Sequence, residues 1–580
     1  MNAYHSMRLA ALTLLLSSSS LAGTVYVATN SPADGPGTEW ANAFHEIQDA
    51  LDAAGLGDTV LVTNGVYDKG SYVVSGVTNR VALVRSVSLQ SVNGPAVTFI
   101  HGAGPLGANA VRCAYLTNGT SMAGFTLANG HTPTSGALRV QSAGGVYLDG
   151  GGTVSNCTIR GNSAKFYGGG VFCDAGGTVQ GCTVVSNTAD DGGGVHFLAG
   201  GTLNHCIIRD NMALTSGGGV NCEQVGTVRS CMISGNEAGS FGGGANIYRD
   251  VLMENCALLD NKANNGGGVV CLETGMVRNC TISGNESIQA GGGAWLGSNG
   301  RLENCIVGGN SAAADGGGVF IHTSGGTIRN CTISGNTCVD DGGGVMCNAG
   351  STIQNTIIHM NAADRYGDNW YTNGAGIAFT YCCTTPTNKL PGGTGCIDVN
   401  PKFADPVFHL QSDSPCIDTG TEIAGVTNDL DGSPRPMDGD ATGGTNTDIG
   451  AYEYARADLD TDGDGLDDWE EVSIHGTAMN SADIDGDGIT DPDEITMGFN
   501  PRVNNSDALA GYGLYTSNSI YDLSMGTLMG AVISGDMNLD LQLQGCTNLG
   551  QGAWTNIGAP VPWSEPADDG KSFFRVWSGQ

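Results

Sequence analysis

Short stretches in which every second residue is apolar recur through the middle of the chain, between residues 150 and 349. In one unit Cys157 and Ile159 flank a threonine, and further on Val171 and Cys173 occupy alternate positions. Alternation with a period of two is typical of a β-strand that buries one face, whereas a helix needs a longer stretch of apolar residues spaced three and four positions apart. No unit carries such a helical stripe. The pattern therefore predicts short strands separated by turns.

These strand patterns belong to a unit of 24 to 26 residues that recurs eight times. Self-similarity at this period indicates a solenoid, in which each unit buries its apolar face only against its neighbours. A unit with three short strands and turns rich in Gly and Asn matches one coil of a right-handed parallel β-helix. The predicted fold class is therefore all-β, with about nine coils stacked about 4.8 Å apart. Each unit is marked by a cysteine, at Cys157, Cys182, Cys206, Cys231, Cys256, Cys280, Cys305 and Cys331. An asparagine follows five positions later, at Asn162, Asn187, Asn211, Asn236, Asn261, Asn285, Asn310 and Asn336.

The marker cysteines and a second set of equivalent positions are predicted to point into the core. The second position accepts Cys, Phe, Ile and Leu, and a thiol at such an apolar position acts as a small hydrophobic group. Parallel side chains in a stack also give poor disulfide torsions, so buried thiols are expected. The chain has no Cys-x-x-Cys pair, which leaves little support for a zinc or redox site. The second set is Cys173, Phe197, Cys222, Ile247, Cys271, Leu296, Ile321 and Cys347.

Three other sets of equivalent residues are explained by stacking alone. Two positions before the marker cysteine, the charge alternates from coil to coil, and opposite charges on adjacent strands attract. The marker asparagines are predicted to hydrogen-bond to turn groups and to one another along the stack. Glycine triplets such as Gly168–Gly170 are predicted to form bends that leave no room for a side chain. The alternating charges are Arg229, Glu254, Arg278, Glu303 and Arg329.

Segments on both sides of the repeats are predicted to close the solenoid. Between residues 38 and 54 the apolar residues fall on one face of a helix, which would cover the strand edges and core of the first coils. After residue 361 the repeat pattern decays, which predicts irregular last coils and a C-terminal cap. The residues on the helical face are Ala41, Phe44, Ile47, Leu51 and Ala54.

The beginning of the chain and its charge indicate export. The first eight residues include an arginine, Leu9–Leu16 form a run that is apolar apart from Thr13, and small residues end at Ala22, as in a secretory signal peptide. No later segment approaches the roughly 18 apolar residues of a membrane-spanning helix, so no transmembrane segment is expected after cleavage. The chain has 57 acidic and 23 basic residues and a net charge of −34, which excludes nucleic acid as a partner. A secreted protein, extracellular or at the cell surface, is therefore expected.

Two acidic loops, residues 460–471 and 483–494, carry the clearest candidate chemistry. Each places carboxylates at positions 1, 3, 5, 9 and 12 and a glycine at position 6. Oxygen ligands at alternate positions, a glycine for the turn and a closing glutamate are typical of a Ca²⁺ loop. The predicted ligands are Asp460, Asp462, Asp464, Asp468 and Glu471 in the first loop. Those in the second loop are Asp483, Asp485, Asp487, Asp491 and Glu494.

The predicted organisation has six parts. They are a signal peptide over 1–22, an N-terminal helical cap with first coils over 23–100, the right-handed parallel β-helix over 101–374, C-terminal coils and a cap over 375–455, a calcium-binding linker over 456–506, and a small β domain over 507–580.

Several stretches also resemble known families. The stretches YVATNSPADGPGTEWANAFHEIQDALDAA, HLQSDSPCIDTG, DLDGSPRP and DIGAYEY, together with the repeats, resemble secreted bacterial right-handed β-helix proteins of the pectin-lyase-like superfamily. The GGGV and Ile-x-x-Asn elements, such as Ile233–Asn236, resemble repeats of polymorphic outer-membrane proteins. The paired acidic loops, followed by NPRVNNSD, resemble bacterial thrombospondin type-3 repeats, and a dockerin module is the second choice. The first resemblance covers about residues 24–455 and implies a fold; its superfamily includes lyases, hydrolases, adhesins and passive rods.

The repeats offer one candidate ligand or catalytic cluster. Asp315 and Asp341 precede glycine triplets on adjacent coils, and Asp340 lies beside them. Trp295 and Phe320 occupy the outward position after the triplets and are predicted to form a strip on which a sugar could stack. No base and anion clamp of the kind a lyase needs is evident.

Another outward position holds His196, close in sequence to Asp190 and Asp191, and it is interpreted as a surface histidine rather than a general base.

The functional hypothesis is a calcium-stiffened, adhesin-like rod that binds an extracellular polysaccharide or surface protein. The alternative is a polysaccharide lyase or glycoside hydrolase acting on acidic polysaccharide. These two classes would be separated by whether a bound polysaccharide is cleaved.

Overall fold

A computed structural model of the chain describes residues 22–322, 325–437, 439, 446–456, 459–486, 488–497 and 499–502, together with five short strands beyond residue 503. The predicted signal peptide, residues 1–22, lies outside the described residues except for Ala22. The chain divides into two compact units, residues 1–456 and 457–580.

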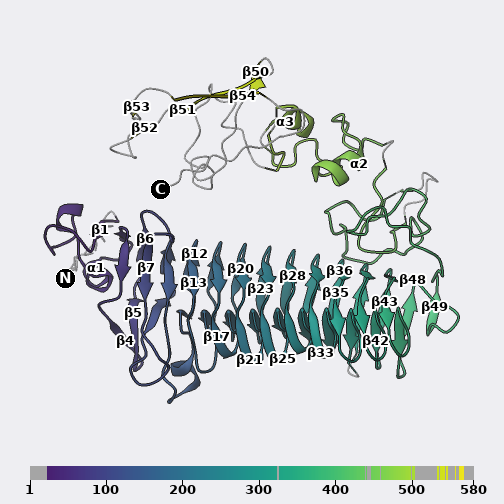
Figure 1. Ribbon diagram of the computed structural model, residues 1–580, viewed down its shortest axis with the longest axis horizontal. Helices are drawn as coiled ribbons and strands as arrows, with labels where there is room; N and C mark the ends of the chain where they lie inside the picture. Colours follow the sequence, from purple (N-terminus) through teal and green to yellow (C-terminus); the bar gives the residue numbers. More distant parts are fainter. Residues whose placement is uncertain are drawn as a thin grey trace, which may run out of the picture. The chain divides into compact units, whose positions relative to one another are not determined.

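The first unit is a parallel β-solenoid in which each coil contributes one strand to each of several long sheets (Figure 1). One coil consists of β15 (Thr178–Gln180), β16 (Thr183–Val185), β17 (Thr188–Asp191) and β18 (Val195–Phe197). Strands of successive coils pair in parallel, as β15 does with β19 (Thr202–Asn204). The predicted all-β solenoid is therefore confirmed.

Four sheets run along the solenoid. Sheet 1 has 15 strands, from β1 (Thr24–Val27) to β49 (Gly392–Thr394); sheet 2 has 13, from β3 (Gly65–Tyr67) to β48 (Cys383–Thr384); sheet 3 has 13, from β4 (Tyr72–Val74) to β46 (Trp370–Thr372); and sheet 4 has 8, from β17 to β45 (Ala362–Ala363).

About thirteen coils are therefore stacked, more than the nine that the repeats predict. Coils near both ends keep their strands without the marker residues. For example, β7 (Thr98–His101) and β10 (Thr126–Ala128) extend sheet 2 with Ile100 and Leu127 in the core. Backbone pairing and an apolar residue suffice for a coil, so counting cysteines underestimates the length of the stack.

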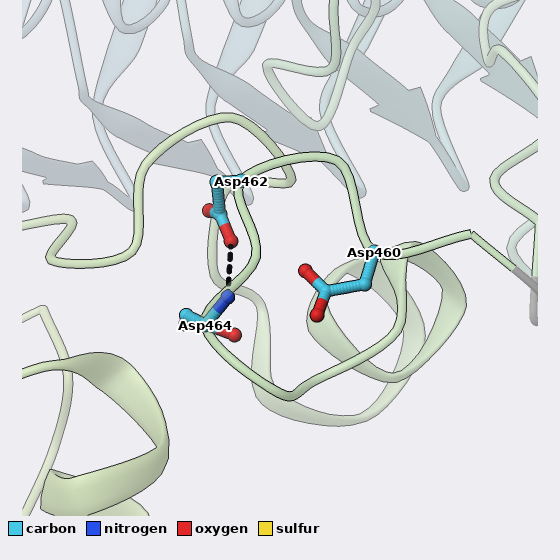
Figure 2. A group of neighbouring side chains, drawn as sticks. All are labelled: Asp460, Asp462 and Asp464. Atoms are coloured by element: carbon cyan, nitrogen blue, oxygen red, sulfur yellow. Dashed lines mark hydrogen bonds between the residues drawn. The ribbon is translucent and has the colours of Figure 1, made fainter.

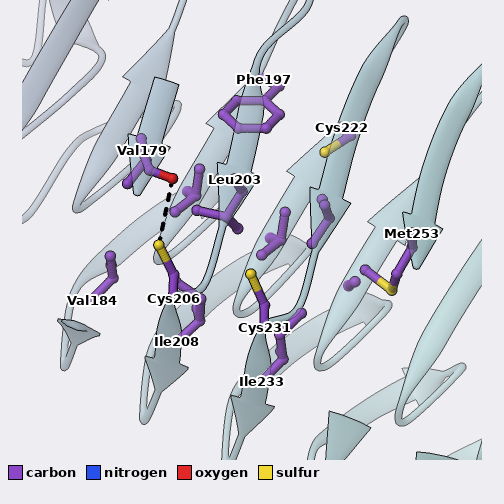
Figure 3. Close-up of a cluster of buried hydrophobic side chains, with 14 of the residues drawn as sticks. Val179, Val184, Phe197, Leu203, Cys206, Ile208, Cys222, Cys231, Ile233 and Met253 are labelled. Carbon is purple, nitrogen blue, oxygen red and sulfur yellow. Dashed lines mark hydrogen bonds between the residues drawn. The ribbon is translucent and has the colours of Figure 1, made fainter. Parts of the chain in front are cut away.

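The marker cysteines line the core, as predicted (Figure 3). Cys206 and Cys231 are 1% and 2% exposed, next to Ile208 and Ile233. Their sulfur atoms also take part in weak hydrogen bonds, since the amide of Cys182 donates to Cys206 Sγ at 3.4 Å. All eighteen cysteines in the described residues are free thiols.

The marker asparagines form a buried ladder of side-chain hydrogen bonds, which confirms their predicted structural role. Asn261 Nδ2 donates to Ile233 O at 2.9 Å and to Asn285 Oδ1 at 3.0 Å. Asn261 Oδ1 in turn accepts from the amide and from Nδ2 of Asn236, both at 3.0 Å. Each asparagine therefore links its own coil to both neighbours.

The glycine triplets make the bend between sheet 4 and sheet 3, and they leave no room for a side chain. The first glycine of one triplet, Gly242, has a φ of +65°, in the left-handed region that favours glycine. A Cβ on the next residue, Gly243, would lie 2.4 Å from the carbonyl oxygen of Lys262 and 2.5 Å from that of Gly267. The predicted tight bends are confirmed.

The alternating charges lie opposite one another on sheet 1, in the predicted register. Arg229 pairs with Glu254, and Glu254 pairs with Arg278. The Nε atoms of the two arginines lie 3.1 Å and 2.9 Å from the Glu254 carboxylate. The two arginines are 51% and 32% exposed, so solvent screens these pairs, and they contribute more to register than to stability.

The N-terminal helix is shorter than predicted. Helix α1 spans Ile47–Ala53, preceded by a 3-10 turn at Trp40–Asn42. Phe44, predicted on the helical face, is extended instead: its amide donates to Tyr26 O and its carbonyl accepts from Ala28 N, both at 2.9 Å. Strand pairing therefore overrides the helical periodicity in the first half of the segment.

The residues after the last coils fold back over sheet 2. Ala451 and Tyr452 pack on Ile306, and the amide of Ala451 donates to Thr332 Oγ1 at 3.1 Å. The ring of His409 packs against that of Tyr452 at a tilt of 37°, with centroids 4.1 Å apart. This segment therefore shields apolar residues on the outer face of several coils.

The segment that folds back over sheet 2 is expected to lose stability as the pH rises because of His409. Burial alone would lower the pKa of His409, but hydrogen bonds to Asp431 and Asp405 outweigh burial and raise the pKa from 6.5 to about 9. The contribution of His409 is therefore complete below pH 6.5 and is lost as the pH rises through about 9. Melting temperatures of wild type and His409→Gln should differ most near pH 6 and converge above about pH 9. A difference independent of pH would contradict this assignment.

The second unit contains the acidic loops and short strands. Helix α2 spans Asp468–Glu470, a π-helical turn spans Glu471–His475, and α3 spans Asp491–Met497. Strands β50 (Val532–Ile533), β51 (Asp536–Leu541) and β54 (Val561–Pro566) form an antiparallel sheet, and β52 (Gln544–Gly545) pairs with β53 (Thr555–Asn556). The rest of the predicted β domain, residues 507–580, lies outside the described residues. Within the described parts of the chain, no helix is both long and apolar enough to cross a membrane.

Candidate functional site

The central residues of the sheet 3 strands form one column on the outer face of the solenoid. Register pairs connect the column coil by coil, from His196 through Asn221 and Asn246 to Trp295. The column is aromatic or apolar toward both ends and polar in the middle. Its members are Tyr115, Tyr147, Phe172, His196, Asn221, Asn246, Val270, Trp295, Phe320, Met346 and Tyr371.

His196 is fully buried, so its interpretation as a surface histidine is wrong. Its ring stacks on Tyr167 at a centroid distance of 4.3 Å, and Phe172 lies on the preceding coil. Tyr167 precedes a glycine triplet, and the sharp bend brings its ring over the column. The neighbours of His196 in the sequence, Asp190 and Asp191, gave no indication that the Tyr167 ring covers it.

The polar part of the column is a chain of hydrogen bonds. Asn246 Nδ2 donates to Asn221 Oδ1 at 2.7 Å, and Asn221 Nδ2 donates to His196 Nδ1 at 3.2 Å. Because an amide nitrogen can only donate, Nδ1 is the acceptor and a neutral His196 carries its proton on Nε2. That Nε2 lies 3.4 Å from the Glu223 carboxylate. Asn246 Oδ1 is buried and has no hydrogen-bond partner among the described residues.

An open groove of about 490 Å³ lies over this polar part, with Asn221 and Asn246 in its lining. One wall is formed by the last residues of two sheet 4 strands, β17 and β21 (Met212–Ser216), and the other wall by the turns that lead from sheet 3 toward sheet 1. The first wall contains Asp191, Thr215 and Ser216, and the second contains Glu223, Gln224, Tyr248, Arg249 and Glu273.

The lining of the groove is polar and carries more negative than positive charge. Asp191, Glu223 and Glu273 each supply a carboxylate, and Arg249 is the one basic residue of the lining. Arg249 Nε lies 3.0 Å from Glu273, which neutralises that pair. Asp191 accepts a hydrogen bond from the Thr215 hydroxyl. The groove therefore suits a ligand rich in hydroxyl groups better than an anion.

The predicted aromatic strip continues the same column two coils beyond Asn246. Trp295 and Phe320 are stacked with centroids 6.2 Å apart and an interplanar angle of 20°. Phe320 is only 8% exposed, whereas Trp295 is half-buried and packs beside Phe320 and Met346. Only the tryptophan therefore presents a partly open ring.

The predicted acidic cluster is brought together, but it is held by an arginine. The amide of Asp341 donates to Asp315 Oδ1 at 3.1 Å. Arg365 on the next coil donates Nε and Nη2 to the two oxygens of Asp341 at 2.8 Å and 2.6 Å, and lies 3.7 Å from Asp340. Burial raises the pKa of Asp315, with a smaller increase from Asp341 and Asp340. Both oxygens of Asp341 are thus occupied by an ion pair.

The first acidic loop gathers its carboxylates around one point (Figure 2). Asp460, Asp462 and Asp464 offer oxygen atoms that lie within 4.8 Å of one another. Asp460 also accepts from the amides of Gly463 and Gly465, at 2.7 Å and 3.1 Å, which shapes the turn. Asp483 repeats this geometry in the second loop, where the equivalent amides donate at 2.8 Å.

The remaining predicted ligands occupy different environments. Asp468 accepts two hydrogen bonds from Thr461 and is buried. Asp485 is half-buried, and Glu494 is fully buried. Asp487 lies outside the described residues.

Among the loop carboxylates, Glu471 has the pKa that burial and neighbouring charges shift most. Burial, followed by the charges of Asp462, Asp464, Asp468 and Asp491, raises the pKa of Glu471 from 4.5 to about 8. An oxygen-only donor set with this much negative charge fits a hard divalent cation such as Ca²⁺. The chemistry of the loops therefore agrees with the group that their spacing predicts.

The sequence reasoning missed the groove. The signal was the replacement of aromatic residues by His196, Asn221 and Asn246 at one position of three successive coils, a polar break in a column that is otherwise apolar. One wall of the groove comes from turns whose sequences vary from unit to unit, and periodicity carries no information about such turns.

The stacked sheets of paired parallel strands define a parallel β-helix. A family model described as a right handed beta helix region matches residues 144–310 and 218–387, which confirms the predicted handedness for the repeats. A comparison with curated proteins found no match.

A search of solved structures found two similar chains, both at low sequence identity and low TM-score. Pectate lyase Pel9A has 13% sequence identity and a TM-score of 0.33, over 75% of this chain and 97% of that chain. The A-module of the Azotobacter vinelandii mannuronan C-5 epimerase AlgE4 has 17% identity and a TM-score of 0.32, over 61% of this chain and 93% of that chain. At these values the likeness assigns no activity to this chain.

Proposed function

We propose that the protein is a secreted or cell-surface, adhesin-like β-helix that binds a glycan along sheet 3 and is stiffened by Ca²⁺ in its second unit. The observation that carries the glycan proposal is the groove of about 490 Å³ over the polar break of the column. Elsewhere the column is filled by packed aromatic and apolar side chains. The polar break therefore opens a hydrogen-bonding surface at one place along the solenoid.

The lining favours an uncharged glycan. Asn246 belongs to the lining of the groove, and amide side chains can exchange hydrogen bonds with sugar hydroxyls. The amide and hydroxyl groups of Asn221 and Ser216 add further donors and acceptors. The carboxylates of Asp191 and Glu223 would repel a uronic acid at the same place. An extracellular polysaccharide made of neutral sugars is thus the proposed ligand class.

Two aromatic residues are placed to stack against sugar rings. Tyr248 lies in the groove wall, and the half-buried ring of Trp295 follows Asn246 in the column after one intervening coil. An aromatic face contributes apolar contact area at a small entropic cost. A glycan that follows the column can therefore contact both the groove and the tryptophan.

Calcium binding is proposed for the acidic loops, within residues 456–506. Without a cation, the crowded carboxylates repel one another; with Ca²⁺ the loops become ordered, since ligands of one ion come from separated positions of the chain. The proposed ligands are those that the loop spacing predicts, beginning with Asp460 and Asp483.

Retention of the full-length protein on immobilised polysaccharides tests the glycan proposal. We expect binding to a neutral polysaccharide and weaker binding to polyuronates, and about tenfold weaker retention for Tyr248→Ala and Trp295→Ala. Trp40→Ala is the matched control, because Trp40 is 40% exposed and packs on Tyr26 in the first strand of sheet 1, away from Tyr248 and Trp295. Equal retention of wild type and both variants would contradict a site on this face.

The same incubation tests the enzymatic alternative. Release of reducing ends or unsaturated products from an acidic polysaccharide, abolished by Asp341→Asn, would establish a lyase or hydrolase and reject the binding function. Arg365 holds the Asp341 carboxylate, so retention without turnover is the expected outcome.

A further inference from the structure

The two acidic loops meet at a second cluster of carboxylates that combines residues of both. Asp464 and Glu471 come from the first loop, and Asp491 comes from the second. Each offers a carboxylate oxygen, and these oxygen atoms lie within 4.8 Å of one another. Loop spacing alone assigns Asp491 to the second loop's own ion, so this meeting is not expected from the sequence.

Several carboxylate oxygens of the cluster are buried without a hydrogen-bond donor. Glu471 is fully buried, and neither of its oxygens has a hydrogen-bond donor within the described ranges. Asp491 is also fully buried, and its Oδ2 lacks a partner there, as does Asp464 Oδ2. A buried carboxylate oxygen without a donor is unfavourable, and the convergence of three negatively charged carboxylates adds their mutual repulsion. A bound cation removes both costs.

One substitution between the loops explains why Asp491 is available. In the first loop the equivalent aspartate, Asp468, accepts from the amide and the hydroxyl of Thr461, both at 2.8 Å. In the second loop Asp491 Oδ1 accepts from the amide of Ile484 at 3.0 Å. Isoleucine has no hydroxyl, so Asp491 Oδ2 has no equivalent donor. The two loops are therefore not equivalent despite their matching spacing.

We propose that Asp464, Glu471 and Asp491 hold one divalent cation jointly, so that the first loop binds its ion with a ligand from the second. Oxygen-only ligands with this much negative charge favour Ca²⁺. The inference rests on the proposed binding of calcium by the acidic loops, and it adds that the loops form one coupled unit. Loss of Asp491 from the second loop should then lower the affinity of the first loop for its cation.

Calorimetric titration of the full-length, chelator-treated protein with Ca²⁺ tests the shared ion. Asp491→Asn keeps the acceptor for the Ile484 amide but lowers the charge, and we expect affinity at the tightest site to fall at least tenfold, as for Glu471→Gln. Asp493→Asn is the matched control, because Asp493 is exposed on the same helix. Asp468→Asn should have a smaller effect than Asp491→Asn, since Thr461 already satisfies Asp468.

A second variant tests the inference without removing a carboxylate. Ile484→Thr introduces a hydroxyl like that of Thr461. This hydroxyl should donate a hydrogen bond to Asp491 Oδ2 and thereby weaken Ca²⁺ binding several-fold. Tb³⁺ luminescence sensitised by Trp469, which lies next to Asp468 in the first loop, should fall in parallel for Asp491→Asn; Trp469→Phe controls the source of the signal.

The outcomes separate the two proposals. A wild-type protein that binds no Ca²⁺ rejects calcium binding as a whole. A wild type that binds Ca²⁺, with Asp491→Asn and Ile484→Thr titrating as wild type does, rejects only the shared ion and leaves each loop with its own. Loss of affinity in Glu471→Gln but in neither of these two variants likewise rejects the shared ion.

Discussion

Replacing Gly243 with alanine is expected to destabilise the solenoid by about 3 kcal/mol or more, the upper range of overpacking effects. The new Cβ would lie 2.4 Å from the carbonyl oxygen of Lys262 and 2.5 Å from that of Gly267. Both atoms belong to the backbone of the next coil, so no side-chain rotation relieves the contact. The coils must separate locally, which also weakens the hydrogen bonds between them. Denaturant unfolding followed by circular dichroism would measure the effect.

Gly226→Ala provides the matched control. Gly226 is also buried, but the nearest atom to its Cβ would be a ring carbon of Phe197 at an ordinary 3.5 Å. The opposite position on the next coil holds Val251, so a side chain fits there. A Gly243→Ala protein as stable as Gly226→Ala would show that the bend can relax, contrary to the expectation.

Replacing Asn261 with alanine is expected to lower the free energy of unfolding by about 2–4 kcal/mol. The substitution removes the bonds from Nδ2 to Ile233 O and Asn285 Oδ1. It also removes the acceptor of the Asn236 amide, leaving a buried donor without a partner. Hydrogen exchange should therefore speed up at the Asn236 amide and in the coils on either side.

Asn265→Ala on the same coil is the control for this ladder. The Asn265 side chain is half-exposed, with a long 3.4 Å contact to Gln289, so its loss should cost less than about 0.5 kcal/mol. If Asn261→Ala were equally mild, the ladder would contribute register but little stability.

The repeats could be predicted from sequence because a solenoid makes each coil face nearly the same environment. Cys157, Ile159 and their equivalents fill the core as the alternation predicts, and the glycines and asparagines take the roles that backbone geometry assigns to them. The N-terminal segment could not be predicted in the same way. Phe44 has a position on a helical face, yet strand pairing with the first strand was available nearby and decided its conformation.

The candidate sites were predictable only where a local spacing defines the chemistry. The Ca²⁺ loops are contiguous, so their carboxylates could be named from sequence alone. The meeting of Glu471 with Asp491 depends on how two loops fold against each other, and no local spacing encodes that. The cover over His196 likewise depends on Tyr167, which a bend in the preceding coil brings over the ring.

The alternating charges of sheet 1 have a consequence for how such a protein can change length. Deleting the single coil that carries Glu254 would place Arg229 against Arg278, and like charges on adjacent strands repel. Deleting two consecutive coils would instead place Arg229 against Glu303 and restore an attractive pair. The same holds for insertions. Adding or removing coils in pairs therefore keeps opposite charges adjacent in this part of sheet 1, whereas adding or removing a single coil brings like charges together.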